Sequence, residues 1–248
     1  MLFLRRITFL REEVPDMEVY PFTVPAISGM NSLNLNKEVT FFVGENGTGK
    51  STLLEAIAYN CGFNTAGGGR NNLYDVESSD AALGKYIRLS WMPKMNQGFF
   101  LRAESFYHFA SYLDQLAVDY PSVYDAYGGK SLHHQSHGES FLSLFLNRFS
   151  GKGIYILDEP EAALSPARQL AFMRVIYQLV SRGNSQFIIA THSPILLGYP
   201  NANIFSFDSG VIEKVKYEDT EHYQITKGFL ERKERYLEQL FLDDDENE

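Results

Sequence analysis

The chain lacks the features that place proteins in a membrane or in an oxidising compartment. It contains a single cysteine, Cys61, so it cannot form an internal disulfide. No segment approaches the roughly 18 consecutive apolar residues of a membrane-spanning helix. Residues 1–10 are apolar but contain Arg5 and Arg6, are too short for a secretory signal and lack a cleavage site. We therefore expect a cytoplasmic protein without membrane insertion, in which Cys61 is a small buried residue.

An excess of positive charge is also missing. The formal net charge is −9, and residues 243–248 carry five negative charges, which leaves about −4 on the rest of the chain. Such a surface has no general electrostatic attraction to nucleic acid, although it leaves a local basic groove open as an alternative. We expect the acidic tail at 243–248 to be disordered and solubilising.

The distribution of apolar residues indicates an α/β fold. Apolar residues make up 44% of the 248 residues, enough for the core of one large domain. Strand-like apolar runs alternate with segments of helical spacing, which is typical of a mainly parallel sheet flanked by helices. We expect one domain over 1–242, with an antiparallel β edge and a small helical lobe at about 105–150. The expected strands are 4–10, 17–27, 39–43, 86–93, 98–104, 154–157, 186–190, 203–207 and 211–217, and the expected helices are 53–59, 106–118, 141–149, 166–182 and 220–242.

A glycine-rich segment between an expected strand and an expected helix fits a phosphate loop. Gly44–Ser51 matches the pattern G-x-x-x-x-G-K-[ST] at every fixed position. The glycines let backbone N–H groups turn toward phosphate oxygens, and the helix that follows adds unpaired N–H groups at its positive end. Lys50 can reach the β- and γ-phosphates, and the Ser51 hydroxyl can ligate Mg²⁺. The predicted nucleotide-binding residues here are Gly44, Glu45, Asn46, Gly47, Thr48, Gly49, Lys50, Ser51 and Thr52.

Two later strands of the expected sheet also end in polar residues. Asp158 and Glu159 follow the apolar run 154–157, and His192 follows the run 186–190. Ligands of such sheets bind outside the carboxyl ends of the strands, so these side chains should meet the phosphate loop. Asp158 can hold Mg²⁺, Glu159 can act as general base for the attacking water, and His192 can contact the γ-phosphate. The alternatives are a helix-capping turn for the two acids and a capping or buried histidine for His192.

One further motif resembles the ATP-binding cassette ATPases. Ser136–Glu139 is similar to their Ser-Gly-Gly-Gln/Glu signature, with His137 in place of the first glycine. The resemblance also covers Gly44–Thr52 as Walker A, Ile156–Pro160 as Walker B, Ala162–Ser165 as the D-loop and His192 as the switch histidine. It implies a P-loop NTPase fold, and it adds Ser136, Gly138 and Glu139 to the nucleotide-binding residues.

Two places depart from the family pattern. The Q-loop glutamine should follow the strand at 99–102, but Gln97 precedes it, and Glu104 is our candidate for the contact to Mg²⁺ or its water. Transporter cassettes usually carry a stacking aromatic before Walker A; Tyr20 and Phe22 are candidates, with a sheet-core role as the other interpretation. The Glu139 signature and the segment 100–104 are more similar to stand-alone ATPases related to the SMC and RecF-like clade.

Two loops carry polar residues whose role the sequence leaves open. Asn64–Asn72, with Arg70, is either a flexible connector or a segment near the nucleotide. His133, His134 and His137 form a cluster that could suggest a metal site. No cysteine or acidic partner at ligand spacing accompanies His133 and His134, so we interpret the cluster as a mobile polar loop.

The resemblance implies an enzyme that uses ATP and Mg²⁺. We expect an ATPase that dimerises on ATP, each site combining one subunit's Walker loops with the other's signature. DNA repair and genome defence are the candidate pathways, and DNA or a partner protein is the candidate coupled partner. The alternatives are an ATP-gated regulatory subunit with little turnover and the ATP-binding subunit of a transporter, although the missing glutamine argues against the transporter.

Overall fold

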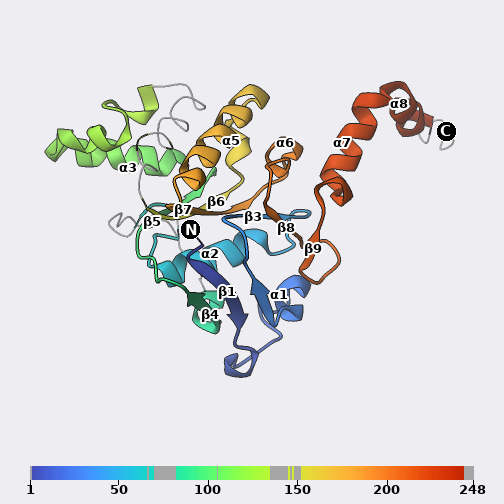
Figure 1. Cartoon of the computed structure of the whole chain (residues 1–248), viewed down its shortest axis with the longest axis horizontal. Coiled ribbons are helices and arrows are strands. Elements are labelled where there is room, and N and C mark those ends of the chain that lie inside the picture. The colour runs from blue at the N-terminus through green and yellow to red at the C-terminus, as the bar shows by residue number, and fades with distance from the viewer. Residues whose placement is uncertain are drawn as a thin grey trace.

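The central sheet of the computed structural model has six strands in the order β5-β6-β7-β3-β8-β9 (Figure 1). All neighbouring pairs are parallel except β8 and β9, which form an antiparallel hairpin. The structure describes residues 2–65, 67–69, 82–104, 106–134, 145, 147 and 152–242. The predicted α/β class with a mainly parallel sheet is thus confirmed. The strands are β3 (Val39–Val43), β5 (Gly98–Arg102), β6 (Gly153–Asp158), β7 (Ser185–Ala190), β8 (Asn203–Ser206) and β9 (Glu213–Val215).

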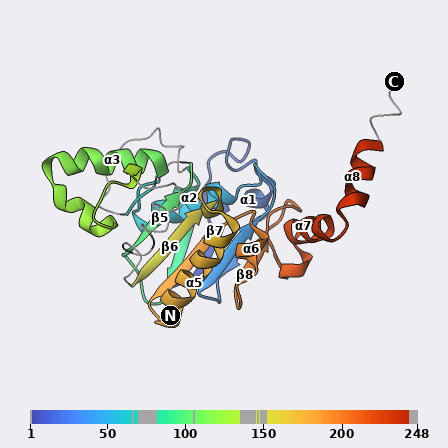
Figure 2. The ribbon, with the colours of Figure 1, turned by 90° about the horizontal axis from the view of Figure 1, so that it is seen from above.

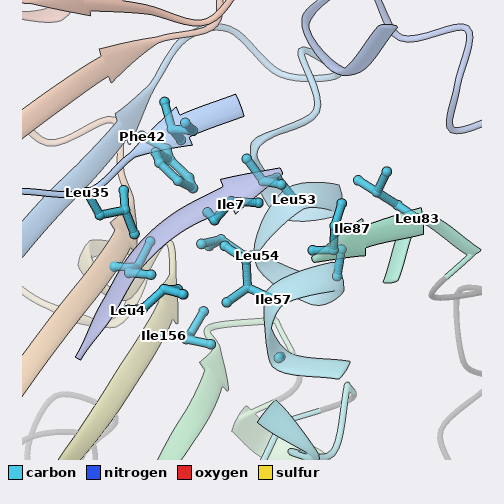
Figure 3. Close-up of a cluster of buried hydrophobic side chains, with 14 of the residues drawn as sticks. Leu4, Ile7, Leu35, Phe42, Leu53, Leu54, Ile57, Leu83, Ile87 and Ile156 are labelled. Atoms are coloured by element: carbon cyan, nitrogen blue, oxygen red, sulfur yellow. The ribbon is translucent and has the colours of Figure 1, made fainter. Parts of the chain in front are cut away.

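Helices cover both faces of this sheet. Figure 1 shows α3 (Phe106–Asp119), α5 (Pro166–Ser181) and α6 (Pro194–Leu197) on one side, and α2 (Lys50–Cys61) on the other. Because both faces are covered, β3, β6 and β7 are buried along their whole length and read as continuous apolar runs. Figure 3 shows Leu53, Leu54 and Ile57 of α2 directed toward other buried side chains, among them Ile7 and Ile156. Cys61, at the end of α2, is buried as expected.

A smaller antiparallel sheet lies beyond α2, in the order β2-β1-β4. It consists of β1 (Leu4–Phe9), β2 (Ser32–Asn34) and β4 (Ile87–Trp91), so the predicted antiparallel region exists as a separate sheet. The predicted strand at 17–27 is wrong. Those residues form turns and the start of α1 (Pro25–Gly29), because Pro21 and Pro25 have no N–H to donate to a strand ladder.

The C-terminal part also differs from the expected single helix. Residues 221–242 form α7 (Glu221–Glu231) and α8 (Lys233–Leu242), separated at Arg232, whose backbone leaves the helical region at φ −139° and ψ 45°. Both helices extend away from the sheet on the side opposite α3 (Figure 2). The expected helix at 141–149 lies outside the described residues except for Phe145 and Asn147, and the acidic tail lies outside them entirely.

Short helical turns complete the described chain. Two of them, Pro121–Tyr127 and Leu132–His134, follow α3. None of the helices in the described ranges is both long and apolar enough to cross a bilayer. The remaining 3-10 helices are Arg11–Glu13, Ala82–Tyr86, Pro160–Ala163 and Tyr217–Asp219.

A buried glutamine joins the two sheets. Gln186, on β7, has no exposed surface, and its Oε1 accepts the N–H groups of Phe3 at 3.0 Å and Leu4 at 2.8 Å. Its Nε2 donates to the Leu4 carbonyl at 2.9 Å. This side chain therefore pairs the polar backbone groups that lead from the N-terminus into β1.

Gln186→Leu should lower the free energy of unfolding by about 2–4 kcal/mol, because each buried backbone group left unpaired costs about 1–3 kcal/mol. Chemical denaturation measures the change. Gln178→Leu, on the exposed face of α5, is the matched control and should stay within about 0.5 kcal/mol of wild type. Equal stability of the two variants would contradict the role of Gln186.

Candidate functional site

The loop between β3 and α2 closes around a buried lysine. Lys50 is only 4% exposed, and its Nζ donates to the carbonyls of Gly44 at 2.6 Å and Glu45 at 2.8 Å. Burial lowers the pKa of the Lys50 ammonium, whereas the carboxylates of Glu159 and Asp158 act in the opposite direction. The ammonium group is therefore held inside the turn, although Lys50 is itself the first residue of α2.

An aspartate from the next strand fixes the start of this loop. Asp208 follows β8, and its Oδ1 accepts the N–H of Glu45 at 2.7 Å while Ser206 donates to its Oδ2 at 2.9 Å. Gly44 has φ +146°, and a Cβ atom there would lie 2.8 Å from Asp208 Oδ1. The sequence analysis missed Asp208, because residues 208–210 form a turn signal and only the pairing of β8 with β3 brings them to the loop.

The loop's serine meets the aspartate at the end of β6. Ser51 Oγ donates to Asp158 Oδ1 at 3.1 Å, and Asp158 is 6% exposed. Burial raises the pKa of Asp158 to about 7, against the opposing effects of Arg102 and the Ser51 hydrogen bond. A hydroxyl beside a carboxylate suits Mg²⁺, which prefers one or two protein oxygens together with water and phosphate oxygens. No group of three or more His, Cys, Asp or Glu that could hold a metal occurs in the described part of the chain.

Glu159 and His192 face each other beside this pair. Glu159 has φ +50°, a left-handed conformation that costs a non-glycine residue about 1–3 kcal/mol, and its N–H donates to the Ala190 carbonyl at 3.0 Å. His192 Nε2 lies 3.5 Å from Glu159 Oε1. The His192 backbone N–H donates to Glu161 Oε1 at 2.6 Å. Burial, followed by the charges of Lys50 and His222, lowers the pKa of His192.

Arg102 ends β5, directly before the place at which the family pattern expects a glutamine. Arg102 forms ion pairs with Glu55 and Glu104, and its Nε lies 3.7 Å from Asp158 Oδ2. A small cavity of about 60 Å³ is lined by Ser51, Arg102, Ala103, Glu104, Asp158 and Glu159. The candidate Glu104 thus lies at this cavity, but its carboxylate contacts Arg102. The sequence analysis missed Arg102, because only the pairing of β5 with β6 places it opposite Asp158.

Comparisons with known proteins concern the family and the fold. One AAA-domain family model matches residues 28–102, and an AAA-domain model whose description names the AbiEii toxin of type IV toxin–antitoxin systems matches residues 130–198. The cassette of an ABC transporter, in its ADP conformation, is 17% identical, with 92% of this chain and 100% of that chain covered and a TM-score of 0.51. An inward-facing metal-chelate type ABC transporter is 16% identical, with 91% and 88% covered and a TM-score of 0.52.

This chain has the fold of the ATP-binding cassette ATPases. An SMC head domain from Thermotoga maritima is a further match, with 17% identity, 87% of this chain and 99% of that chain covered, and a TM-score of 0.45. Among curated proteins, none matches the sequence.

The structure separates the two aromatic candidates that precede the loop. Tyr20 is 67% exposed, and its hydroxyl shares a 3.0 Å hydrogen bond with Thr52 Oγ1 beside the loop, so it is not a core residue. Phe22 is buried and packs on Phe9 and Tyr86, as the sheet-core interpretation requires. Ser136, His137, Gly138, Glu139 and Arg70 lie outside the described residues.

The two described histidines of the 133–137 cluster belong to the turn Leu132–His134, which contacts α3. His133 Nε2 and Ser111 Oγ are 3.0 Å apart, and the His133 ring packs on Tyr107. His134 is exposed.

Asp158→Asn should stabilise the metal-free cassette above about pH 7. The pKa of this carboxyl rises from 3.8 to about 7 on folding, so its contribution to stability is complete below about pH 4 and is lost as the pH rises through 7. A neutral amide avoids that loss, which is on the order of 2–4 kcal/mol. Thermal melts between about pH 5 and pH 8 measure it, with the exposed Asp125→Asn as control. A lower melting temperature for Asp158→Asn at pH 8 would contradict the role of burial.

Proposed function

We propose that this protein binds ATP and hydrolyses it with Mg²⁺. The observation that carries the proposal is the hydrogen bond of 3.1 Å between Ser51 and Asp158, which brings the phosphate loop to the acidic end of β6. A turn that merely capped α2 would not need a buried lysine on one side and a buried aspartate on the other. The two AAA-domain matches and the cassette fold support the same class of activity.

Each residue of the site has a separate role in this proposed reaction. Lys50 supplies positive charge to the β- and γ-phosphates, and the loop amides with the start of α2 surround the phosphate oxygens. Ser51 and Asp158 would hold Mg²⁺, which neutralises charge that develops on the phosphates. Glu159 accepts the proton of the attacking water as general base. His192, directly beside Glu159, donates a hydrogen bond to the γ-phosphate.

We infer that ATP also joins two copies of the chain. The tip of the loop, Glu45–Gly47, is exposed, so one side of a bound triphosphate would remain open to a second molecule. In this proposal Ser136, Gly138 and Glu139 of a second copy close that side, and two-fold symmetry creates two equal sites. Because the γ-phosphate is the group that both copies contact, ADP should not hold the dimer. The domain proposed for this role spans 1–242, with the signature in the lobe at about 105–150.

Two further assignments belong to the same proposal. The AAA-domain model described for the AbiEii toxin favours genome defence over DNA repair as the pathway, with DNA or a protein as the coupled partner. An ATP-gated regulatory subunit with slow turnover is the second candidate, favoured by Arg102, which pairs with Glu104 where a catalytic contact to Mg²⁺ was expected. The transporter subunit is disfavoured, because Arg102 ends β5 where the coupling glutamine would follow.

Glu159→Gln should retain ATP binding and lose at least about 100-fold in hydrolysis rate, because the amide keeps the shape of the side chain but cannot take the proton of water. Single-turnover hydrolysis with Mg²⁺ measures the rate, and nucleotide titration measures binding. Glu238→Gln, exposed on α8, is the matched control and should hydrolyse at the wild-type rate. A Glu159→Gln rate within a few-fold of wild type would remove Glu159 as the base.

The same variant tests the assembly. Light scattering coupled to size exclusion should show a dimer of Glu159→Gln with ATP and Mg²⁺, and a monomer with ADP. Ser136→Arg, added to this background, should block the dimer by its bulk and leave ATP binding of the monomer intact. A monomer at saturating ATP, or an equal dimer with ADP, would contradict ATP-driven pairing and leave the regulatory alternative.

A further inference from the structure

A second histidine lies directly behind His192. His192 Nδ1 and His222 Nε2 are 2.8 Å apart, and the two ring centroids are 5.0 Å apart. His222 belongs to the first turn of α7, which begins beside α6 and leads away from the sheet (Figure 1). The contact therefore ties the C-terminal helices to the histidine that faces Glu159.

Neighbouring hydrogen bonds hold His222 in this place. Thr220, the N-cap residue of α7, is 4% exposed, and its Oγ1 donates to the Tyr217 carbonyl at 2.7 Å. The Tyr217 hydroxyl in turn donates to the carbonyl of Pro194 at 2.9 Å, two residues after His192. The start of α7 and the segment that carries His192 are thus joined at two points, and the distance between the two rings does not depend on one flexible side chain.

The geometry selects one proton arrangement. Exactly one proton can lie between two ring nitrogens that are hydrogen-bonded to each other, because a neutral imidazole has one N–H donor and one bare acceptor. If His222 Nε2–H donates, His192 Nδ1 is the acceptor, and the His192 proton must sit on Nε2, the atom 3.5 Å from Glu159. His222 Nδ1 is then bare. Both His222 Nδ1 and His192 Nε2 are buried without a hydrogen-bond partner, so the Glu159 carboxylate 3.5 Å from Nε2 is the neighbour that favours a proton on that atom.

The opposite arrangement would disable the site. A proton on His192 Nδ1 would leave a bare Nε2 facing the Glu159 carboxylate and, in the bound state, the phosphate. Both are acceptors, so no hydrogen bond could form. A doubly protonated His192 is disfavoured because burial and the nearby Lys50 charge lower its pKa.

We propose that His222 is a positioning residue that holds His192 in the Nε2–H tautomer, with that N–H directed at Glu159 and the γ-phosphate. This inference deepens the ATPase function proposed above and rests on it for its catalytic consequence. The hydrogen bond itself does not depend on the presence of nucleotide. His222 touches neither substrate nor metal ligands in this scheme and acts only through His192.

The first experiment reads the tautomer in the nucleotide-free protein. Imidazole ¹⁵N shifts of the full chain, labelled at its six histidines, would be assigned for His192 by loss of the signal in His192→Ala. We expect a bare Nδ1 and a protonated Nε2 in wild type and in His222→Gln, whose amide N–H has a similar reach. His222→Phe keeps the ring volume without a nitrogen and should give a mixture of tautomers. A protonated Nδ1 in wild type, or an unchanged tautomer in His222→Phe, would overturn the proposal.

The second experiment reads the consequence for catalysis. His222→Phe should lower single-turnover ATP hydrolysis about 10-fold with unchanged ATP affinity, and His222→Gln should stay within about 3-fold of wild type. Thr226→Leu, exposed on the same helix, controls for general effects on α7. Equal losses of hydrolysis rate in His222→Phe and His222→Gln would show that His222 has only a structural role. If wild type does not hydrolyse ATP, the proposed function fails, while the tautomer measurement still decides the role of His222.

Discussion

Lys50 and Asp158 place opposite charges at an edge of the sheet from which water is largely excluded. Each is less than a tenth exposed, and an isolated buried charge would cost several kcal/mol. The site therefore depends on mutual compensation. The carbonyls of Gly44 and Glu45 accept hydrogen bonds from the ammonium, and Ser51 and Arg102 lie beside the carboxylate. Burial lowers the pKa of Lys50 and raises the pKa of Asp158 to about 7, because it disfavours the charged form of each group.

The parallel sheet makes this compensation possible. β3, β7, β6 and β5 lie side by side, so the residues that end them converge although they are far apart in sequence. Two buried cores, one on each face, keep the strands in register. Hydrogen bonds of polar side chains then attach peripheral segments to the sheet. Gln186 binds the backbone at Leu4, Asp208 binds the backbone of the phosphate loop, and His222 contacts His192 from α7.

Sequence reasoning located residues correctly where the signal was local. The phosphate loop and the strand-terminal Asp158, Glu159 and His192 could be predicted because each lies next to a buried apolar run. It failed at 17–27, where alternating apolar residues suggested a strand but prolines imposed turns. It also gave one final helix in place of two, since residues 229–235, around the change of direction at Arg232, contain no glycine or proline.

The partners of the site could not be predicted for a different reason. Arg102, Asp208 and His222 act through tertiary contacts, and their positions depend on strand order and on the place beside α6 where α7 begins. In the sequence each is an ordinary polar residue: Arg102 ends a strand, Asp208 lies in a turn and His222 lies at the start of a helix. Tyr20 similarly could be separated from Phe22 only by its exposure and its hydrogen bond to Thr52.

The central claim is that this edge of the sheet is a nucleotide site built around Lys50. Calorimetric titration of the full chain with ATP, with and without Mg²⁺, tests it most directly. The account predicts saturable binding that Mg²⁺ strengthens and that Lys50→Ala weakens at least about 100-fold, because a charge-assisted contact to phosphate is lost. Lys94→Ala, an exposed lysine, should bind as wild type does. Equal ATP affinity in a folded Lys50→Ala protein would contradict the account.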